Sequence, residues 1–259
     1  MDGSCFLQGL TRVNESHAIM TCGGYGDSRV LIATGFDSSK IVTRVVFSAP
    51  SRKYFIEGCA IVGDKLFVLT WRENVVFELS MKNFSLVKTH SYPREGWGLT
   101  YNPDRDELWA SDGSSSLFVL DSHSLGTIRS CKVTLSHDGL TSVPVRYINE
   151  LEYIEGTIYA NVYMESGNDP AAPNYVLGID PGSCKVRSVL PVFGLRGPSS
   201  PGGVFNGIAQ GFNQGELLVS GKLWKKMYAI QVDSTATKPD RLWTKFNITD
   251  FLSSNLSFR

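Results

Sequence analysis

One short phrase recurs five times along this chain and sets the size of its structural unit. Each copy has a polar or aromatic residue, then a small or acidic residue, then an apolar one, and copies begin roughly 40 to 57 residues apart. The copies are Gln8-Gly9-Leu10, Glu57-Gly58-Cys59, Trp97-Gly98-Leu99, Asn149-Glu150-Leu151 and Asn206-Gly207-Ile208. A period of this size, filled with short alternating strands, is typical of one blade of a β-propeller.

Each copy of the phrase is followed by a turn and then by two further segments with the alternating pattern of strands. The second strands are expected at 65–69, 107–110, 157–160 and 216–219, and the third strands at 75–79, 117–121, 176–180 and 227–230. No amphipathic helix is indicated, and two segments rich in Pro, Gly, Ser and Asn, 165–174 and 194–203, are expected to be loops. The sequence predicts an all-β, five-bladed propeller of four-stranded antiparallel blades, a single domain over residues 1–259.

The first and second strands of each unit predict where a site lies. In an antiparallel hairpin the first residue of one strand lies beside the last residue of the next, so the two positions share one end of the blade. The first position is the start of the phrase, and the second reads Cys22, Trp71, Asp112, Tyr163 and Lys222. These polar and aromatic residues differ from blade to blade, which favours one binding site built from five unlike contributions. The alternative is a water-filled channel lined by polar groups.

Composition excludes several classes of partner and chemistry. With 25 basic and 25 acidic residues, no net charge attracts nucleic acid or anionic lipid, and no apolar run is long enough to span a membrane. The five cysteines are scattered without a CxxC pair, which disfavours a zinc knuckle or redox pair and implies at least one free thiol. GxSxG, HExxH, EF-hand and GxGxxG patterns are absent, and His17, His90, His123 and His137 lie outside both predicted rings.

The compartment is left open by the sequence. The first residues do not form a signal peptide, which favours a soluble cytoplasmic protein. Four glycosylation sequons, at Asn14, Asn83, Asn247 and Asn255, favour instead a glycoprotein of the secretory pathway whose export segment lies upstream.

Nine short motifs, in order along almost the whole chain, resemble the plant and bacterial glutaminyl-peptide cyclotransferase family. They are Phe6-Leu7-Gln8-Gly9-Leu10, Phe55-Ile56-Glu57-Gly58, Leu69-Thr70-Trp71, Glu95-Gly96-Trp97-Gly98-Leu99, Ser111-Asp112-Gly113-Ser114, Asn149-Glu150-Leu151-Glu152-Tyr153, Ala160-Asn161-Val162, Asn206-Gly207-Ile208-Ala209 and Ser220-Gly221-Lys222-Leu223-Trp224. One position departs from the family pattern, because Tyr163 stands where a tryptophan is usual.

The resemblance implies a metal-independent, cofactor-free five-bladed propeller that cyclises the N-terminal glutamine of peptides or proteins to pyroglutamate and releases ammonia. It assigns the role of acid/base carboxylate to Glu57, with Lys222 and Asn149 as supporting groups. The substrate-binding residues that it implies are Phe6, Gln8, Phe55, Trp71, Trp97 and, at the departing position, Tyr163. The expected partners are peptides that begin with Gln, and neither nucleic acid nor membrane; we expect a monomer.

The chemistry of the residues agrees with this activity. A single carboxylate can take a proton from the attacking amine and give it to the leaving NH2, and burial of Glu57 among aromatic rings would raise its pKa and improve it as the later acid. Lys222, Asn149 or an indole N–H could stabilise the oxyanion. Glu95 is the second candidate carboxylate, although it could instead fix its loop. Lys222 is not part of a phosphate-binding loop, because Leu223 occupies the Ser/Thr position.

Two other functions remain open. A catalytically impaired propeller that binds peptide ends is favoured if Tyr163 has disabled turnover. A sugar- or lactone-acting propeller with a central calcium would need several acidic ligands at the axis, where the predicted rings offer only Glu57 and Asp112.

Overall fold

The computed structural model of the chain describes residues 3–36, 40–136, 141–163, 174–192, 195 and 203–232. These residues form 21 strands and no helix, so none of them belongs to a helix long and apolar enough to cross a membrane. Most of 165–174 and 194–203, predicted to be loops, lies outside the described residues, as do His137, Asn247 and Asn255.

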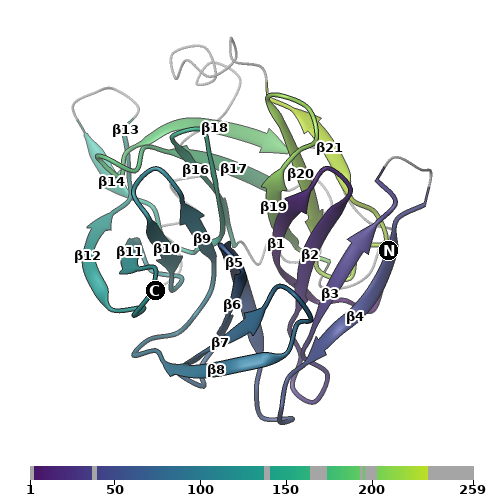
Figure 1. The fold of residues 1–259 in the computed structure, drawn as a ribbon. Coiled ribbons are helices and arrows are strands. Elements are labelled where there is room, and N and C mark those ends of the chain that lie inside the picture. The colour runs from purple at the N-terminus through teal and green to yellow at the C-terminus, as the bar shows by residue number, and fades with distance from the viewer. Residues whose placement is uncertain are drawn as a thin grey trace.

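Five antiparallel sheets surround a central axis, and each is built from a continuous part of the chain (Figure 1). Blade 1 contains β1 (Leu7–Asn14), β2 (His17–Cys22), β3 (Arg29–Thr34) and β4 (Val42–Ser48); blade 2 contains β5 (Ile56–Val62), β6 (Lys65–Thr70), β7 (Val75–Ser80) and β8 (Leu86–Ser91). Blade 3 contains β9 (Leu99–Asn102), β10 (Glu107–Ser111), β11 (Ser116–Asp121) and β12 (Thr127–Lys132); blade 4 contains β15 (Ile148–Ile154), β16 (Thr157–Val162), β17 (Asn174–Ile179) and β18 (Val186–Val192).

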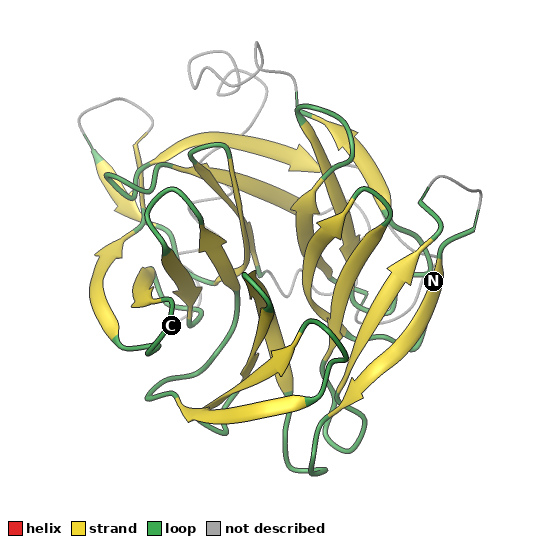
Figure 2. Ribbon diagram, in the orientation of Figure 1, coloured by secondary structure: helices red, strands yellow, loops and turns green. Residues whose placement is uncertain are grey.

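Blade 5 has three strands within the described residues, β19 (Phe205–Gln210), β20 (Glu216–Gly221) and β21 (Tyr228–Gln231). A separate two-stranded sheet, β13 (Thr134–Ser136) and β14 (Ser142–Pro144), connects blades 3 and 4. Figure 2 shows the strands, drawn in yellow, arranged around the centre of the molecule. The prediction of a five-bladed all-β propeller is confirmed, and the opening hairpin of each repeat lies innermost, because β1, β5, β9, β15 and β19 contact one another around the axis.

The apolar residues pack between neighbouring blades. Ile19 and Val30 of blade 1 form one buried cluster with Val68 and Phe77 of blade 2, and a similar cluster lies at each of the next three interfaces. A fifth cluster joins residues of blade 1 such as Leu10 to residues of blade 5, and so closes the ring. The alternating pattern of the strands follows from this packing, because each sheet buries one face against each neighbour.

Hydrogen bonds also link each innermost hairpin to the next. Four side chains donate to backbone oxygens of the following blade: Thr21 Oγ1 to Glu57 O at 2.6 Å, Ser111 Oγ to Asn149 O at 2.6 Å, Asn161 Nδ2 to Phe205 O at 2.9 Å, and Asn206 Nδ2 to Leu7 O at 3.1 Å. Between blades 2 and 3 the Gly58 amide donates to Trp97 O at 2.7 Å. All five junctions are therefore hydrogen-bonded, including the one between the last blade and the first.

The middle residue of the repeated phrase explains the close approach of the inner strands. A Cβ on Gly58 would lie 2.6 Å from Trp97 O, and a Cβ on Gly98 would lie 2.1 Å from Asn149 O. Blade 4 has Glu150 at this position instead. Its buried carboxylate accepts from the Leu10 amide at 3.2 Å and the Ile208 amide at 2.7 Å. Glycine brings the strands together, and Glu150 ties blade 4 to blades 1 and 5.

Two disulfides join cysteines that the sequence left unpaired. Cys5 pairs with Cys22 beside blade 1, and Cys131 on β12 pairs with Cys184 in the turn between β17 and β18, which links blade 3 to blade 4. Cys59 is the free thiol that the odd number required, and it is buried.

Replacing Gly98 tests the close packing at the axis. We expect Gly98→Ala to lower the free energy of unfolding by about 2–4 kcal/mol, because the new Cβ would displace the Asn149 carbonyl. Urea unfolding followed by circular dichroism measures the change. Gly126→Ala is the control, since its Cβ would meet only Ser124 Oγ at 3.3 Å; equal losses for the two variants would contradict the packing argument.

Candidate active site

β-Bulges set the direction of the side chains at the first position of the repeated phrase. The pairing of β1 with β2, β5 with β6, β15 with β16 and β19 with β20 shifts register beside Gln8, Glu57, Asn149 and Asn206, respectively. A bulge re-aims the side chain at the irregular position. All four side chains are buried near the axis.

Six residues form a ring of contacts, here called the collar, that is complete only with Glu95; they are Phe6, Phe55, Trp71, Trp97, Tyr163 and Lys222. Ring centroids are 6.3 Å apart for Phe6 and Phe55, 5.6 Å for Phe55 and Trp71, and 6.0 Å for Trp97 and Tyr163. Lys222 Nζ closes the collar, because it lies 4.7 Å from the Tyr163 ring centre and 4.5 Å from that of Phe6. Trp71 and Trp97 are joined through a shared partner, Glu95.

Glu95 accepts a hydrogen bond from each indole of the collar. Its Oε2 receives Trp71 Nε1–H at 3.0 Å and Trp97 Nε1–H at 3.2 Å, while its Oε1 pairs with Arg72 Nε at 3.2 Å. The Arg72 guanidinium in turn stacks on Trp71 at 3.9 Å from the ring centre. Of the three oxyanion donors considered from the sequence, the indole N–H groups are thus already engaged, and the loop-fixing interpretation of Glu95 agrees with these contacts.

Two glycines leave space for collar side chains. A Cβ on Gly23 would lie 2.2 Å from the Phe55 ring, and a Cβ on Gly113 would lie 2.5 Å from Trp97. Gly113 also has φ +76°, which few other residues adopt without strain. The backbone at both positions is therefore shaped around an aromatic ring.

Glu57 is a buried carboxylate in a charged neighbourhood. Burial raises its pKa well above the usual value; the positive charge of Lys222 opposes the rise, and the carboxylates of Glu73 and Glu95 add to it. The carboxylate and the ammonium proposed from the sequence therefore interact. The backbone around Glu57 is held by its neighbours, because the Ile56 amide donates to Ser28 Oγ at 3.0 Å and the Phe55 amide donates to Glu73 Oε2 at 3.2 Å.

The amides beneath the collar differ in how they are paired. Gln8 Oε1 accepts from Asn206 Nδ2 at 2.8 Å, so these two side chains hold each other across the junction of blades 5 and 1. Asn149 is 3% exposed, and its Oδ1 has no hydrogen-bond partner among the described residues. A buried amide oxygen without a partner is costly, which marks Asn149 as a group available to a ligand.

One position of the predicted rings is different in the structure. The Trp71 amide donates to Phe55 O, and the corresponding donor to Phe6 O is Gly23, so Cys22 was wrongly placed in the ring. The reason is an extra bulge between Arg12 and Asn14, which lengthens the first hairpin by one residue. Asp112 accepts from the Ser114 amide at 3.0 Å and holds a turn.

Sequence reasoning missed the groups that support the collar from outside. Tyr25 packs on Phe55 with ring centroids 5.3 Å apart, and its hydroxyl donates to Glu73 Oε1 at 3.1 Å. Neither residue belongs to the repeated phrase, so periodicity alone gave no signal for them. Within the described residues, no group of three or more His, Cys, Asp or Glu side chains is arranged to hold a metal ion.

Comparisons with known proteins agree with the sequence motifs. The sequence profile of the glutamine cyclotransferase family matches residues 1–232. The glutaminyl-peptide cyclotransferase of Arabidopsis thaliana is 31% identical over 245 residues, which cover 92% of this chain and 70% of that protein. The crystal structure of Myxococcus xanthus glutaminyl cyclase has 30% sequence identity and a TM-score of 0.70, with 89% of this chain and 92% of that one covered. The chain therefore belongs to the glutamine cyclotransferase family.

Proposed function

We propose that this protein is a glutaminyl-peptide cyclotransferase that converts the N-terminal glutamine of peptides and proteins to pyroglutamate and releases ammonia. The family and its similar relatives support the activity. The observation that carries the mechanism is the buried Glu57 carboxylate, whose raised pKa is opposed by the charge of Lys222, a member of the aromatic collar.

The reaction needs one proton carrier. The α-amine nitrogen attacks the side-chain carboxamide carbon, and Glu57 takes a proton from that nitrogen as the new C–N bond forms. The protonated Glu57 then gives this proton to the carboxamide nitrogen, whose bond to carbon breaks to release NH3 and leave the lactam. The raised pKa of Glu57 suits both halves of the cycle, because a carboxyl group with a pKa nearer neutrality is a better acid catalyst at working pH.

Two groups are available for the oxyanion that forms on the carbonyl oxygen. Lys222 supplies a positive charge and Asn149 supplies its amide N–H as a donor, while Asn149 Oδ1, which has no hydrogen-bond partner among the described residues, can accept from an N–H of the substrate. The indole N–H groups of Trp71 and Trp97 donate to Glu95 and take no part in this step. The aromatic rings fold the glutamine side chain over its own backbone and exclude water, which disfavours hydrolysis to glutamate.

Glu57→Gln tests the catalytic role directly. We expect ammonia release from a Gln-initiated peptide to fall by about 10²- to 10⁴-fold, because the amide cannot carry the proton. Mass spectrometry follows the loss of ammonia, and Glu78→Gln, which alters another buried carboxylate on β7, should retain activity. Peptide binding by the wild type without conversion would favour the alternative of an impaired peptide-binding propeller.

The pH profile of kcat/KM tests the protonation state of Glu57. The base must be ionised, so activity should be low at acidic pH and rise through the raised pKa of Glu57 and through the pKa of the substrate amine, near 8. In the pH profile of the residual activity of Glu57→Gln, only the rise that follows the pKa of the substrate amine should remain. An acid limb with the same midpoint in both proteins would rule out Glu57 as its source.

Changes at Glu95 test the fixing of the two indoles. Glu95→Ala leaves both indole N–H groups without their acceptor, and we expect kcat/KM to fall about tenfold with a shift in tryptophan fluorescence. Glu95→Gln retains one acceptor oxygen and should lose less. Arg72→Gln is the control for the ion pair with Glu95: it leaves both indole hydrogen bonds in place and removes the guanidinium that stacks on Trp71. Equal losses in all three variants would show that charge, and not indole orientation, is what matters.

A further inference from the structure

Phe6 belongs to a short segment that precedes β1 and is held at three points. The Gly23 amide donates to Phe6 O at 2.9 Å, the Leu223 amide donates to Cys5 O at 2.8 Å, and Arg29 Nη2 donates to Ser4 Oγ at 2.7 Å. Only one of these contacts reaches Leu223, the neighbour of Lys222. The segment that carries the Phe6 ring is therefore bonded to the residue that follows Lys222.

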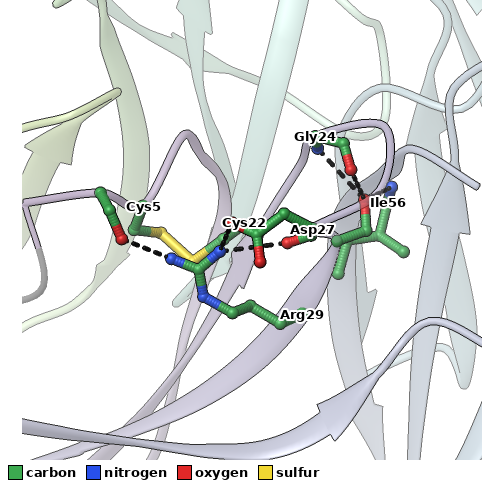
Figure 3. Close-up of polar contacts among 8 residues, drawn as sticks. Cys5, Cys22, Gly24, Asp27, Arg29 and Ile56 are labelled. Atoms are coloured by element: carbon green, nitrogen blue, oxygen red, sulfur yellow. Dashed lines mark hydrogen bonds and ion pairs between the residues drawn. A yellow bond between two sulfur atoms is a disulfide. The ribbon is translucent and has the colours of Figure 1, made fainter. Parts of the chain in front are cut away.

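A disulfide fixes this piece of backbone to blade 1. Cys5 and Cys22 are both buried, with Cα atoms 5.1 Å apart, and they lie directly before Phe6 and Gly23. Figure 3 shows the bond beside Arg29, whose guanidinium also contacts Asp27. The same view shows Gly24 near Ile56, and Ser28 Oγ hydrogen-bonds to both of these residues, so the turn after Cys22 also reaches the strand that carries Glu57.

We propose that the Cys5–Cys22 disulfide is a positioning element of the active site, which holds the Phe6 ring against Lys222. This inference rests on the proposed function for its kinetic test. Leu223 has φ +62°, a conformation that a non-glycine residue adopts only when its surroundings impose it, and its amide is bonded to Cys5 O. The disulfide is thus connected through one hydrogen bond to the backbone next to Lys222, and through one peptide bond to Phe6.

The chain contains a matched control for a purely stabilising role. The Cys131–Cys184 disulfide joins residues 53 apart in sequence, against 17 for Cys5–Cys22, and it connects blades 3 and 4 through the outermost strand β12. In the chain-entropy account, a disulfide that closes a longer loop stabilises the fold more. Loss of the Cys131–Cys184 disulfide should therefore cost at least as much stability as loss of Cys5–Cys22. A stabilising role predicts that activity follows stability in both variants, whereas a positioning role predicts that only the first variant loses activity.

A double-mutant cycle measures the connection between the disulfide and Phe6. We expect C5S/C22S to lower kcat/KM about tenfold at a temperature where it remains folded, and Phe6→Ala to lower it about tenfold in the wild type. Combined, the two changes should cost little more than either alone. On the C131S/C184S background, Phe6→Ala should retain its full effect. If the fold losses in kcat/KM for Phe6→Ala and C5S/C22S multiply in the combined variant, the proposal is wrong.

A second measurement needs no enzymatic activity. Lys222 is 5% exposed, so acetylation by an amine-reactive reagent, mapped by mass spectrometry, should be slow in the wild type. We expect it to rise several-fold in C5S/C22S and to stay unchanged in C131S/C184S. An inactive wild type with this labelling pattern would reject the proposed function and retain the positioning role. Equal Lys222 labelling in all three proteins would reject the positioning role.

Discussion

The close approach of five inner strands at the central axis is the constraint on which the rest of this structure depends. Gly58 and Gly98 allow neighbouring strands to lie closer than a Cβ would permit, and a hydrogen bond crosses each of the five junctions. Glu150, at the equivalent position of blade 4, accepts from blades 1 and 5 at once. The inner strands are therefore held together by close backbone contacts, by hydrogen bonds and by one carboxylate that joins three blades.

The bulges that interrupt strand pairing also lie beside the polar side chains of the candidate site. Glu57, Asn149, Gln8 and Asn206 are buried beside these irregular positions, beneath a collar that Lys222 completes. Burial and nearby carboxylates raise the pKa of Glu57, and Lys222 limits the rise. In the mechanism that we propose, this balance between desolvation and one opposite charge allows the Glu57 carboxyl group to serve as both base and acid.

Sequence reasoning was accurate wherever a residue lay at a repeated position in a regular hairpin. It placed the first strand of each blade and brought Trp71, Trp97, Tyr163 and Lys222 to one end of the axis. The family resemblance added Phe6 and Phe55, and the structure joins all six in a collar. It failed at Cys22, because one additional bulge in the first hairpin moved Gly23 into the ring position. Counting residues along a chain cannot reveal a bulge whose position depends on how two strands pair.

The sequence by itself determined the number of blades and the side chains expected around the axis, because both follow from a repeat and from alternating polarity. Only the tertiary structure decided how those side chains are paired. It showed that Glu95 accepts from both indole N–H groups, that Asn149 Oδ1 has no partner within the part of the chain that the structure describes, and that Cys5 is bonded to Cys22. These partners come from different blades, and their contacts exist only after the ring has closed.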